Sequence, residues 1–418
     1  MIDDSLVSTV EGGNGHGTGG LTPRPKSRTS SMDYLKQLKK LFLDYLYFDP
    51  GQIMVLEFVL SMVLGNRWFR QTDPLWGHLV GPPGCGKSTI LDALGGSDDF
   101  YLIDSLTPNS FVSGYRDSDN KGNDPSLLPL IDGKIMVVLD FSTVLSLRYE
   151  QQQAIFSDLR RLYDSGEIRK HKGNIGMMEY NSRFGMLTAV TQDVERLSMQ
   201  VAPLGERFLV YRMGMEDRVA FQTKSIDWIN QKSDVREELR KVTGQLLQSI
   251  PHVNADDIKF TGKQLEVVCV LADVMSAWRT YVPRDRTTSS RDPYYIPSPE
   301  APGRLTTQLF LLAESHAVLY NRMEVTDEDL PLVARVAWNS LPSWRTTLLR
   351  LFMGGEALTS MTVRDLLGVD PRTLRRHLED LTLLKLLHVV RKGTYVMAPR
   401  YQKRLEIAKP FLPEFDKL

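Results

Sequence analysis

The stretch GPPGCGKST, residues 81–89, decides the fold class of this chain, because it fits the pattern G-x-x-x-x-G-K-[ST] in full. The apolar run WGHLV precedes it and KSTILDAL follows it, so the sequence predicts a strand, a glycine-rich loop and a helix in that order. Gly81, Gly84 and Gly86 allow the backbone to curl until several N–H groups point inward. Those amides and the N-terminus of the following helix form a cradle for phosphate oxygens.

The same loop predicts a bound nucleotide, ATP, together with Mg²⁺. We expect the Lys87 ammonium to reach the β- and γ-phosphates and the Ser88 hydroxyl to ligate the metal. An accidental turn of glycine and proline would give similar letters, but motif, strand and helix all agree here. The residues expected to line the nucleotide site are Gly81, Pro82, Pro83, Gly84, Cys85, Gly86, Lys87, Ser88 and Thr89.

The composition bounds the class of protein. The 418 residues are enough for two or three domains, and the 51 basic and 51 acidic residues cancel, which argues against a polybasic protein. Two cysteines, Cys85 and Cys269, cannot form a disulfide framework, which suits a reducing compartment. No secretory signal is visible, and the longest apolar stretch, 53–65, is too short to span a bilayer and carries Glu57. We therefore expect a cytoplasmic protein with no membrane partner.

Short apolar runs alternate with helical stretches after the loop, which predicts an α/β fold built on a parallel sheet. The runs lie at 100–104, 134–140, 184–190 and 207–213. The predicted parts of the chain are a disordered tail at 1–31, a helical segment at 32–75, an α/β core at 76–225, a helical region at 226–341 and a small C-terminal domain at 342–418.

An acidic residue at the end of a neighbouring strand is the second requirement of such a site, and IMVVLD supplies Asp140. One carboxylate for the metal and a second for the attacking water are expected, but the next residue is Phe141. Asp140 could serve the metal, act as the base or do both; alternatively it only caps the following turn. Asp158 and Asp164, on the predicted helix at 149–164, are the next acids to consider.

Two further residues follow from the strand pattern. Thr191 ends the run FGMLTAVT at the carboxyl edge of the sheet, where it could orient the attacking water or simply be solvated. Arg207 opens the last strand, away from its own nucleotide, where an arginine can reach the γ-phosphate bound by a neighbouring subunit. The alternative for Arg207 is a surface ion pair with Glu206.

A basic hairpin is predicted between Asp140 and Thr191. The run Arg169, Lys170, His171, Lys172 is followed by Gly173-Asn174, a two-residue turn signal. A hairpin carrying such cations can hold a phosphate backbone, so Arg169, Lys170 and Lys172 are expected to contact DNA. The alternative is a solvated, charged hairpin.

The C-terminal part predicts a winged-helix domain. A helix at 343–353 precedes the short helix TVRDLLG, a turn, the helix PRTLRRHLEDLTLLKLL and the hairpin HVVRKGTYVM. Arginines early on the second helix of such a motif reach the groove or its phosphates, and the hairpin tip carries two more cations. The expected DNA contacts are Arg372, Arg375, Arg376, Arg391 and Lys392. The alternative is a domain that contacts proteins.

The order of these elements resembles an AAA+ ATPase core. A later stretch resembles the lid of minichromosome-maintenance-type helicases; it reads GRLTTQLFLLAESHAVLYNRMEVTDEDLPLVARVAW (303–338). The resemblance covers about 75–340. It implies that Arg304 is the lid arginine that contacts the γ-phosphate, Thr191 the polar residue after the fourth strand, and Arg207 the finger arginine. Two departures stand out: Asp140 takes either the Asp or the Glu position of the family's acidic pair, and the family's large N-terminal DNA-binding domain has no counterpart.

These features predict an ATPase that drives a DNA transaction. The resemblance implies a homo-oligomeric ring, six subunits being the expected number, that works as a replicative helicase or replication-initiation motor of a phage or mobile element. A single strand would pass through the channel, the winged helix would hold duplex DNA, and other replication proteins would be partners. Two alternatives stay open: a helicase loader or MoxR-like protein-remodelling ATPase, and an ATP-dependent DNA-binding switch without significant turnover.

Overall fold

The computed structural model of the chain describes residues 30–49, 51–68, 73–114, 125–173, 176–195, 207–214, 216–227, 232–285, 287 and 291–413. Residues 1–29 of the tail predicted to be disordered at 1–31, and the turn residue Asn174, lie outside the described residues. The last two residues of that predicted tail are ordered, and the prediction is wrong there, because Ser30 caps a helix that begins at Ser31. None of the described helices has both the length and the apolar character needed to cross a membrane.

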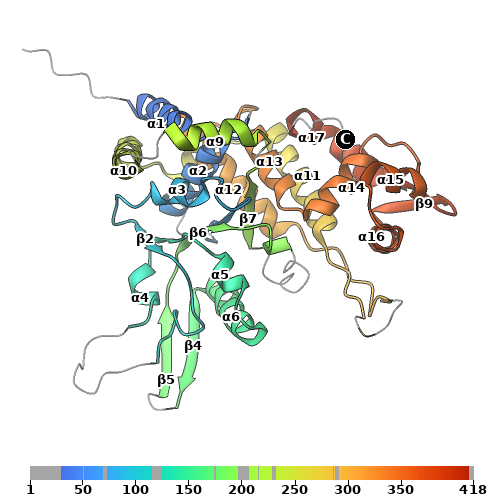
Figure 1. The fold of residues 1–418 in the computed structure, drawn as a ribbon, viewed down its shortest axis with the longest axis horizontal. Coiled ribbons are helices and arrows are strands. Elements are labelled where there is room, and N and C mark those ends of the chain that lie inside the picture. Colours follow the sequence, from blue (N-terminus) through green and yellow to red (C-terminus); the bar gives the residue numbers. More distant parts are fainter. Residues whose placement is uncertain are drawn as a thin grey trace, which may run out of the picture.

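A parallel sheet of five strands forms the centre of the chain, with the order β2-β3-β6-β1-β7 (Figure 1). The fold is therefore mixed α/β, and the predicted parallel pairing is confirmed. Because all five strands run the same way, their carboxyl ends meet at one edge of the sheet. The strands are β1 (Trp76–Val80), β2 (Phe100–Ile103), β3 (Ile135–Val138), β6 (Gly185–Val190) and β7 (Phe208–Arg212).

Helices cover both faces of this sheet, which explains why its strands are continuous apolar runs. Leu79 of β1 belongs to one core cluster, and Trp76 and Val80 of the same strand belong to the other. The first cluster includes residues of α2 (Met54–Trp68), α3 (Lys87–Asp92), α12 (Gly303–Leu319) and α13 (Leu330–Asn339). The second includes residues of α4 (Leu128–Ile131), α5 (Ser142–Leu145) and α6 (Tyr149–Ser165).

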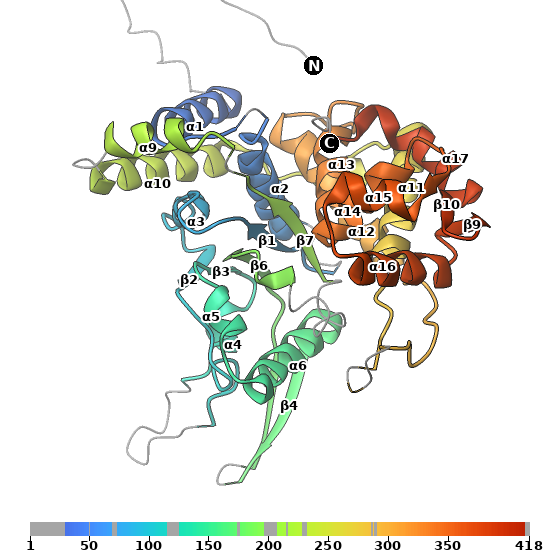
Figure 2. The ribbon, with the colours of Figure 1, turned by 45° about the vertical axis from the view of Figure 1, so that its right-hand side comes forward.

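The predicted helical region at 226–341 divides into two groups (Figure 2). In the first, α10 (Lys232–Ser249) packs against α1 (Ser31–Tyr45) and α3, and α9 (Arg218–Asp227) crosses the predicted boundary at 225. In the second, α11 (Gly262–Arg279) packs against α12 and α13, and α13 also contacts β7. The short helix η1 (Ala255–Asp257) lies between α10 and α11 in the chain. The first group therefore lies near the glycine-rich loop.

A buried polar network explains how the apolar helix α2 tolerates Glu57. The carboxylate accepts hydrogen bonds from Lys39 of α1 (2.5 Å) and Tyr320 (2.7 Å), and it faces His316 of α12 (3.4 Å). Burial alone would raise the pKa of Glu57, but the hydrogen bonds from His316 and Lys39 outweigh it and lower the pKa to about 2. The ion pairs thus join α1, α2 and α12 into one body.

Glu314 on α12 provides a test of this packing. Its side chain is buried, and this burial, with a smaller contribution from Asp256, raises the pKa of the carboxyl to about 8. Because the folded-state pKa lies above the unfolded value, the stability that this group contributes is present in full below about pH 4.5 and is lost as pH rises through 8. The folded protein therefore holds this carboxyl in its protonated form at neutral pH.

Glu314→Gln should stabilise the protein increasingly between pH 5 and pH 9, because the amide cannot ionise. The gain in unfolding free energy should reach on the order of 5 kcal/mol at pH 9, since the pKa is raised from 4.5 to about 8 and each pKa unit corresponds to about 1.4 kcal/mol. Urea unfolding of both proteins at several pH values measures it. A difference between the two proteins that does not change with pH would contradict the assignment.

The C-terminal residues form a small α/β unit with the predicted element types. Two helices, α15 and α16, precede a hairpin, and the three-stranded sheet has the order β8-β10-β9. Gly368 ends α15 with φ +61°, and Gly393 has φ +76° in the hairpin turn, conformations that favour glycine. The elements are α14 (Ser343–Phe352), β8 (Leu358–Thr359), α15 (Ser360–Leu367), α16 (Pro371–Leu383), β9 (Leu387–Arg391), β10 (Thr394–Met397), α17 (Pro399–Ala408) and η2 (Lys409–Phe411).

This C-terminal unit is packed firmly on the helices before it. Its buried residues belong to the same core cluster as α11 and α13. Arg284, from the long loop between α11 and α12, forms ion pairs with Asp380 (2.6 Å) and Glu379 (3.0 Å) of α16. Arg404 of α17 pairs with Asp273 of α11.

Candidate functional site

The glycine-rich loop leaves the sheet at its carboxyl edge, between β6 and β7. The Gly81 amide donates to the Val190 carbonyl (3.2 Å), and the Met213 amide donates to the Val80 carbonyl (2.7 Å). A Cβ at Gly81 would lie 2.9 Å from the Met213 carbonyl oxygen, so a larger residue would collide with backbone. Gly84 and Gly86 have φ of +82° and +89°, which L side chains rarely adopt. The glycines are therefore required by the path of the loop.

Lys87 lies inside the curve of this loop. It is buried, with 7% of its surface exposed, and its ammonium donates to the carbonyl oxygens of Gly81 (2.8 Å) and Pro82 (2.7 Å). The Cys85 sulfur, also buried, lies 3.7 Å from the same nitrogen. The loop thus concentrates positive charge at its centre, where an anion of matching size would be held.

Ser88 and Asp140 are brought together by the contact between α3 and β3. The Ser88 hydroxyl donates to the carbonyl of Leu139 (3.0 Å), the residue directly before Asp140. The Asp140 side chain is exposed at this edge, and its Oδ1 accepts from the Ser142 amide (2.9 Å). The Asp140 carboxylate therefore binds the turn that leads into α5, which is the alternative considered for this residue from the sequence. Asp140 also directly follows the residue whose carbonyl Ser88 contacts.

Thr191 follows β6, the strand that lies between β1 and β3. Its amide donates to the Ser142 hydroxyl (3.0 Å), and its own hydroxyl donates to Asp193 (3.1 Å). This strand order places Thr191 between the glycine-rich loop and Asp140. The polar side chains predicted around the loop therefore share one edge of the sheet.

Two carboxylates at the same edge were missed by the sequence reasoning. Asp104 follows β2 and its carbonyl accepts from the Asp140 amide (3.2 Å); Asp193 lies shortly after β6. Both could have been found by asking which acid follows each predicted strand. Among the described residues, no group of three or more histidine, cysteine or acidic side chains could hold a metal by protein ligands alone.

A cavity of about 300 Å³ adjoins the loop. The end of α1 and the helices α9 and α10 enclose it, and a Cβ at Gly86 would lie 3.0 Å from Leu46 of this wall. Beside residues of the loop itself, among them Lys87, its lining includes four apolar or aromatic side chains and two further cations: Tyr45, Leu46, Phe221, Val235, Lys224 and Arg236. The sequence carried no signal for this cavity, because its walls come from segments that are far apart in the chain.

Arg207 and Arg304 lie together at the opposite edge. Phe208 pairs with Trp76 at the start of β1, so Arg207 is roughly 15 Å from the loop that follows β1. The Arg207 guanidinium donates to both oxygens of Asp164 (3.0 and 2.5 Å), and Arg304 approaches the same carboxylate (3.6 Å). Glu206, the partner considered from sequence, lies outside the described residues.

The predicted basic hairpin forms a two-stranded ribbon, β4 (Glu167–Lys172) and β5 (Gly176–Asn181), that extends beyond the central sheet (Figure 1). Lys170 forms an ion pair with the buried Asp158 of α6, and Lys172 donates to Asn109 (3.2 Å). These two lysines therefore bind the ribbon to its own core.

The other face of the ribbon is solvent-exposed. Arg169 lies there and pairs with Glu179 (2.7 Å), next to His171 and Met177, which are paired across the strands. Met177 is 65% exposed, which is unusual for a large apolar side chain on a ribbon. His171 and Met177 were missed as surface residues because the sequence does not say which face of the ribbon packs inward.

The cations predicted in the C-terminal unit lie on its surface with one exception. Arg372 and Arg375 are exposed near the start of α16, and Lys392 is exposed in the hairpin turn. Arg391 is exposed beside it and donates to the Thr394 hydroxyl (3.3 Å). Arg376 is half-buried, because its turn of α16 is covered by the long loop that carries Arg284.

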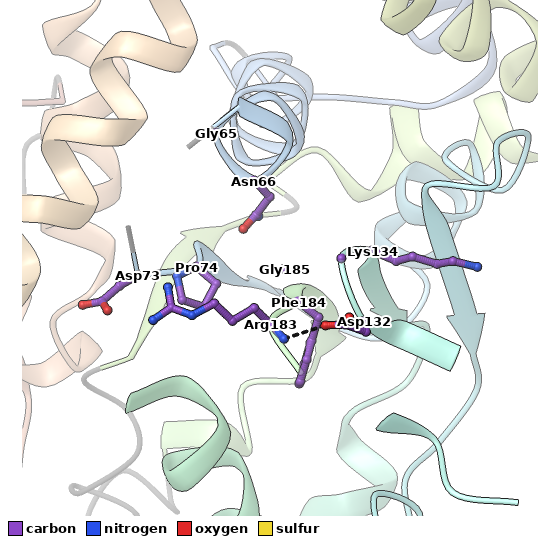
Figure 3. Close-up of a pocket in the computed structure, with 10 residues that line it drawn as sticks. Gly65, Asn66, Asp73, Pro74, Asp132, Lys134, Arg183, Phe184 and Gly185 are labelled. Atoms are coloured by element: carbon purple, nitrogen blue, oxygen red, sulfur yellow. Dashed lines mark hydrogen bonds between the residues drawn. The ribbon is translucent and has the colours of Figure 1, made fainter. Parts of the chain in front are cut away.

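A second cavity, of about 210 Å³, lies at the amino edge of the sheet (Figure 3). The Arg183 amide donates to Asp132 there (3.0 Å). Asn66 bridges its wall by hydrogen bonds to both the N–H and the C=O of Leu75, and a Cβ at Gly185 would collide with it at 2.5 Å. These contacts show that the cavity lies where α2 packs against the starts of β1 and β6.

Compared with known proteins, the chain matches no family model and no curated protein. The functional assignment therefore rests on the geometry of the chain itself.

Proposed function

We propose that this protein is an ATPase of the AAA+ class that acts on DNA as a ring-forming motor, either a replicative helicase or a replication-initiation motor. The observation that carries the proposal is the glycine-rich loop with the Lys87 ammonium at its centre and Ser88 against the strand end that bears Asp140. The strand order supports it, since Thr191 follows β6. This strand lies between β1, which leads into the glycine-rich loop, and β3, which leads to Asp140.

The residues at this edge fit ATP and Mg²⁺. The backbone of the loop and Lys87 would hold the phosphates, and Ser88 and Asp140 offer the oxygen ligands that Mg²⁺ prefers. The aromatic and aliphatic part of the cavity beside the loop, with Tyr45, Leu46 and Phe221, suits a base. Bound ATP with its metal supplies the phosphoanhydride bond that is broken. Asp140, with Asp104 and Asp193 at the same edge, supplies carboxylates that can accept a proton from water, and Thr191 can orient that water.

The arginine pair supports an assembly in which subunits complete one another's sites. Arg207 and Arg304 lie at the edge opposite their own loop, so in this proposal both would serve the nucleotide of a neighbouring copy. A head-to-tail contact of this kind closes into a ring when its rotation closes, and six subunits are the number we propose.

The DNA assignment rests on exposed cations at two places, the C-terminal unit and the ribbon. The order of α14, α15, α16 and the β9–β10 hairpin supports a winged helix, with Arg372 and Arg375 exposed at the start of the recognition helix α16. On the ribbon, His171 and Arg169 are the exposed candidates for a strand in the channel. Arg169 would have to exchange its ion pair with Glu179 for a phosphate, and Lys170 is held by the buried Asp158.

ATP turnover measured with and without single-stranded DNA tests the proposal. We expect turnover that DNA stimulates several-fold, together with ring-shaped particles in the presence of a non-hydrolysable ATP analogue. Turnover that ignores DNA would favour the protein-remodelling alternative, and DNA binding without turnover would favour the assembly switch. Absence of nucleotide binding would overturn the proposal as a whole.

Arg372→Ala/Arg375→Ala should weaken duplex binding and lower the slope of log K against log salt by about two, roughly one unit per lost phosphate contact. Both side chains are exposed, so the fold should be unaffected. The control is Lys263→Ala on α11, which removes one exposed cation elsewhere. Fluorescence anisotropy at several salt concentrations measures the effect, and an unchanged slope would contradict a DNA-binding role for α16.

A further inference from the structure

Asp164 is the common partner of the two arginines. It accepts two hydrogen bonds from Arg207, at Nε (3.0 Å) and at one terminal nitrogen (2.5 Å), and its Oδ1 lies 3.6 Å from Arg304. A carboxylate that receives a guanidinium through two parallel N–H groups fixes the plane of that guanidinium. One acidic side chain therefore sets the orientation of Arg207 and the distance of Arg304 from it.

The surroundings of Asp164 restrict both guanidiniums further. The ring of Tyr163 lies beneath both, with the guanidinium carbons 5.8 Å (Arg207) and 5.9 Å (Arg304) from its centre. Gln308 donates to the Tyr163 hydroxyl (3.0 Å) and to the Arg207 carbonyl (2.8 Å). The cluster thus joins α6, the start of β7 and α12, three segments separated by long stretches of chain.

The burial of the cluster distinguishes it from an ordinary surface ion pair. The Arg207 side chain is only 8% exposed, whereas Asp164 is 46% exposed and Arg304 is 31% exposed. A guanidinium that is shielded on its inner side and held by a carboxylate has few orientations left. Its orientation is consequently set before any phosphate arrives.

We infer that Asp164 is a positioning residue for the nucleotide site of a neighbouring copy of this chain: it holds Arg207 and Arg304 side by side so that both meet the same triphosphate. The inference rests on the proposed function, in which these arginines act across a subunit boundary. Asp164 itself lies at the far edge from its own loop, so it acts through the arginines.

Asp164→Ala should lower kcat for ATP about 10- to 100-fold and leave the Kd for ATP unchanged, because misplacement of a catalytic group affects turnover and not the loop that binds. Asp164→Asn keeps an acceptor oxygen without the charge, so its kcat should fall between those of Asp164→Ala and wild type. Asp132→Asn, an exposed carboxylate at the same edge, is the control and should match wild type.

A double-mutant cycle separates positioning from a general loss of structure. Asp164→Ala should lower kcat in wild type but have no further effect in an Arg207→Ala/Arg304→Ala background, because its action passes through those side chains. Mixing Asp164→Ala with Lys87→Ala subunits should restore part of the activity. If Asp164→Ala lowers kcat equally in both backgrounds, the positioning role is overturned.

The outcomes also separate this inference from the function on which it rests. If the arginine variants lose turnover while Asp164→Ala and Asp164→Asn keep it, the inference alone fails. If the arginine variants keep wild-type turnover, the shared-site proposal fails and the positioning role with it. Circular dichroism and the melting temperature of each variant establish that it is folded, and Asp164→Asn serves if the alanine variant is not.

Discussion

Replacing Lys87 with alanine should raise the Kd for ATP about 100-fold or more and abolish measurable turnover. The ammonium is buried at the centre of the loop, where it contacts two carbonyl oxygens and would face the phosphates. A hydrogen bond to a charged group contributes about 1.5–3 kcal/mol. The loss of two such contacts with phosphate therefore corresponds to an increase in Kd of about 100-fold or more. Isothermal titration calorimetry with a non-hydrolysable analogue measures it directly.

Lys134→Ala is the matched control for this variant. Lys134 precedes β3 at the opposite edge of the same sheet, so the change removes the same charge and volume without touching the loop. It should bind ATP as wild type does. Equal affinity of wild type and Lys87→Ala would overturn the site itself, and with it the proposed ATPase.

Arg207→Ala should lower ATP turnover about 10³-fold and leave the Kd for ATP within a factor of about two, since the side chain acts on a neighbour's nucleotide. The geometric reason is its place at the amino edge of the sheet, beside Trp76 and not beside the loop. Arg183→Ala, an exposed arginine at the same edge, is the control and should keep its turnover.

Mixed assemblies test whether Arg207 acts across the boundary. Arg207→Ala subunits carry an intact loop, and Lys87→Ala subunits carry an intact arginine, so an interface between the two kinds combines both. Part of the turnover should return on mixing, with a maximum at an intermediate ratio. No recovery at any ratio, in subunits shown to co-assemble, would contradict action in trans.

The central sheet could be predicted because its signal is local. The apolar runs at 100–104 and 184–190 became β2 and β6 within one residue at either end. Strands buried on both faces need unbroken runs of apolar residues, and such runs are visible in sequence. The glycine-rich loop is local in the same sense, since its positive φ angles demand glycine at fixed positions.

The faces of the ribbon could not be predicted in this way. Its alternating residues divide between an inner and an outer face, but the alternation looks the same whichever face packs inward. The choice is made by α6, whose buried Asp158 takes Lys170 as its partner. This contact directs Lys170 and Lys172 toward the core, and it leaves Arg169 and His171 exposed.

Sequence alone was sufficient for the glycine-rich loop, the parallel sheet and some of the polar residues at the ends of its strands, because each depends on neighbours a few positions away. Tertiary structure decided which groups meet across long stretches of chain. Arg207 and Asp164 are 43 residues apart, and α1, whose end lines the cavity beside the loop, packs on the distant helix α10. Such contacts depend on how helices and strands pack in three dimensions, and a linear pattern carries no record of that packing.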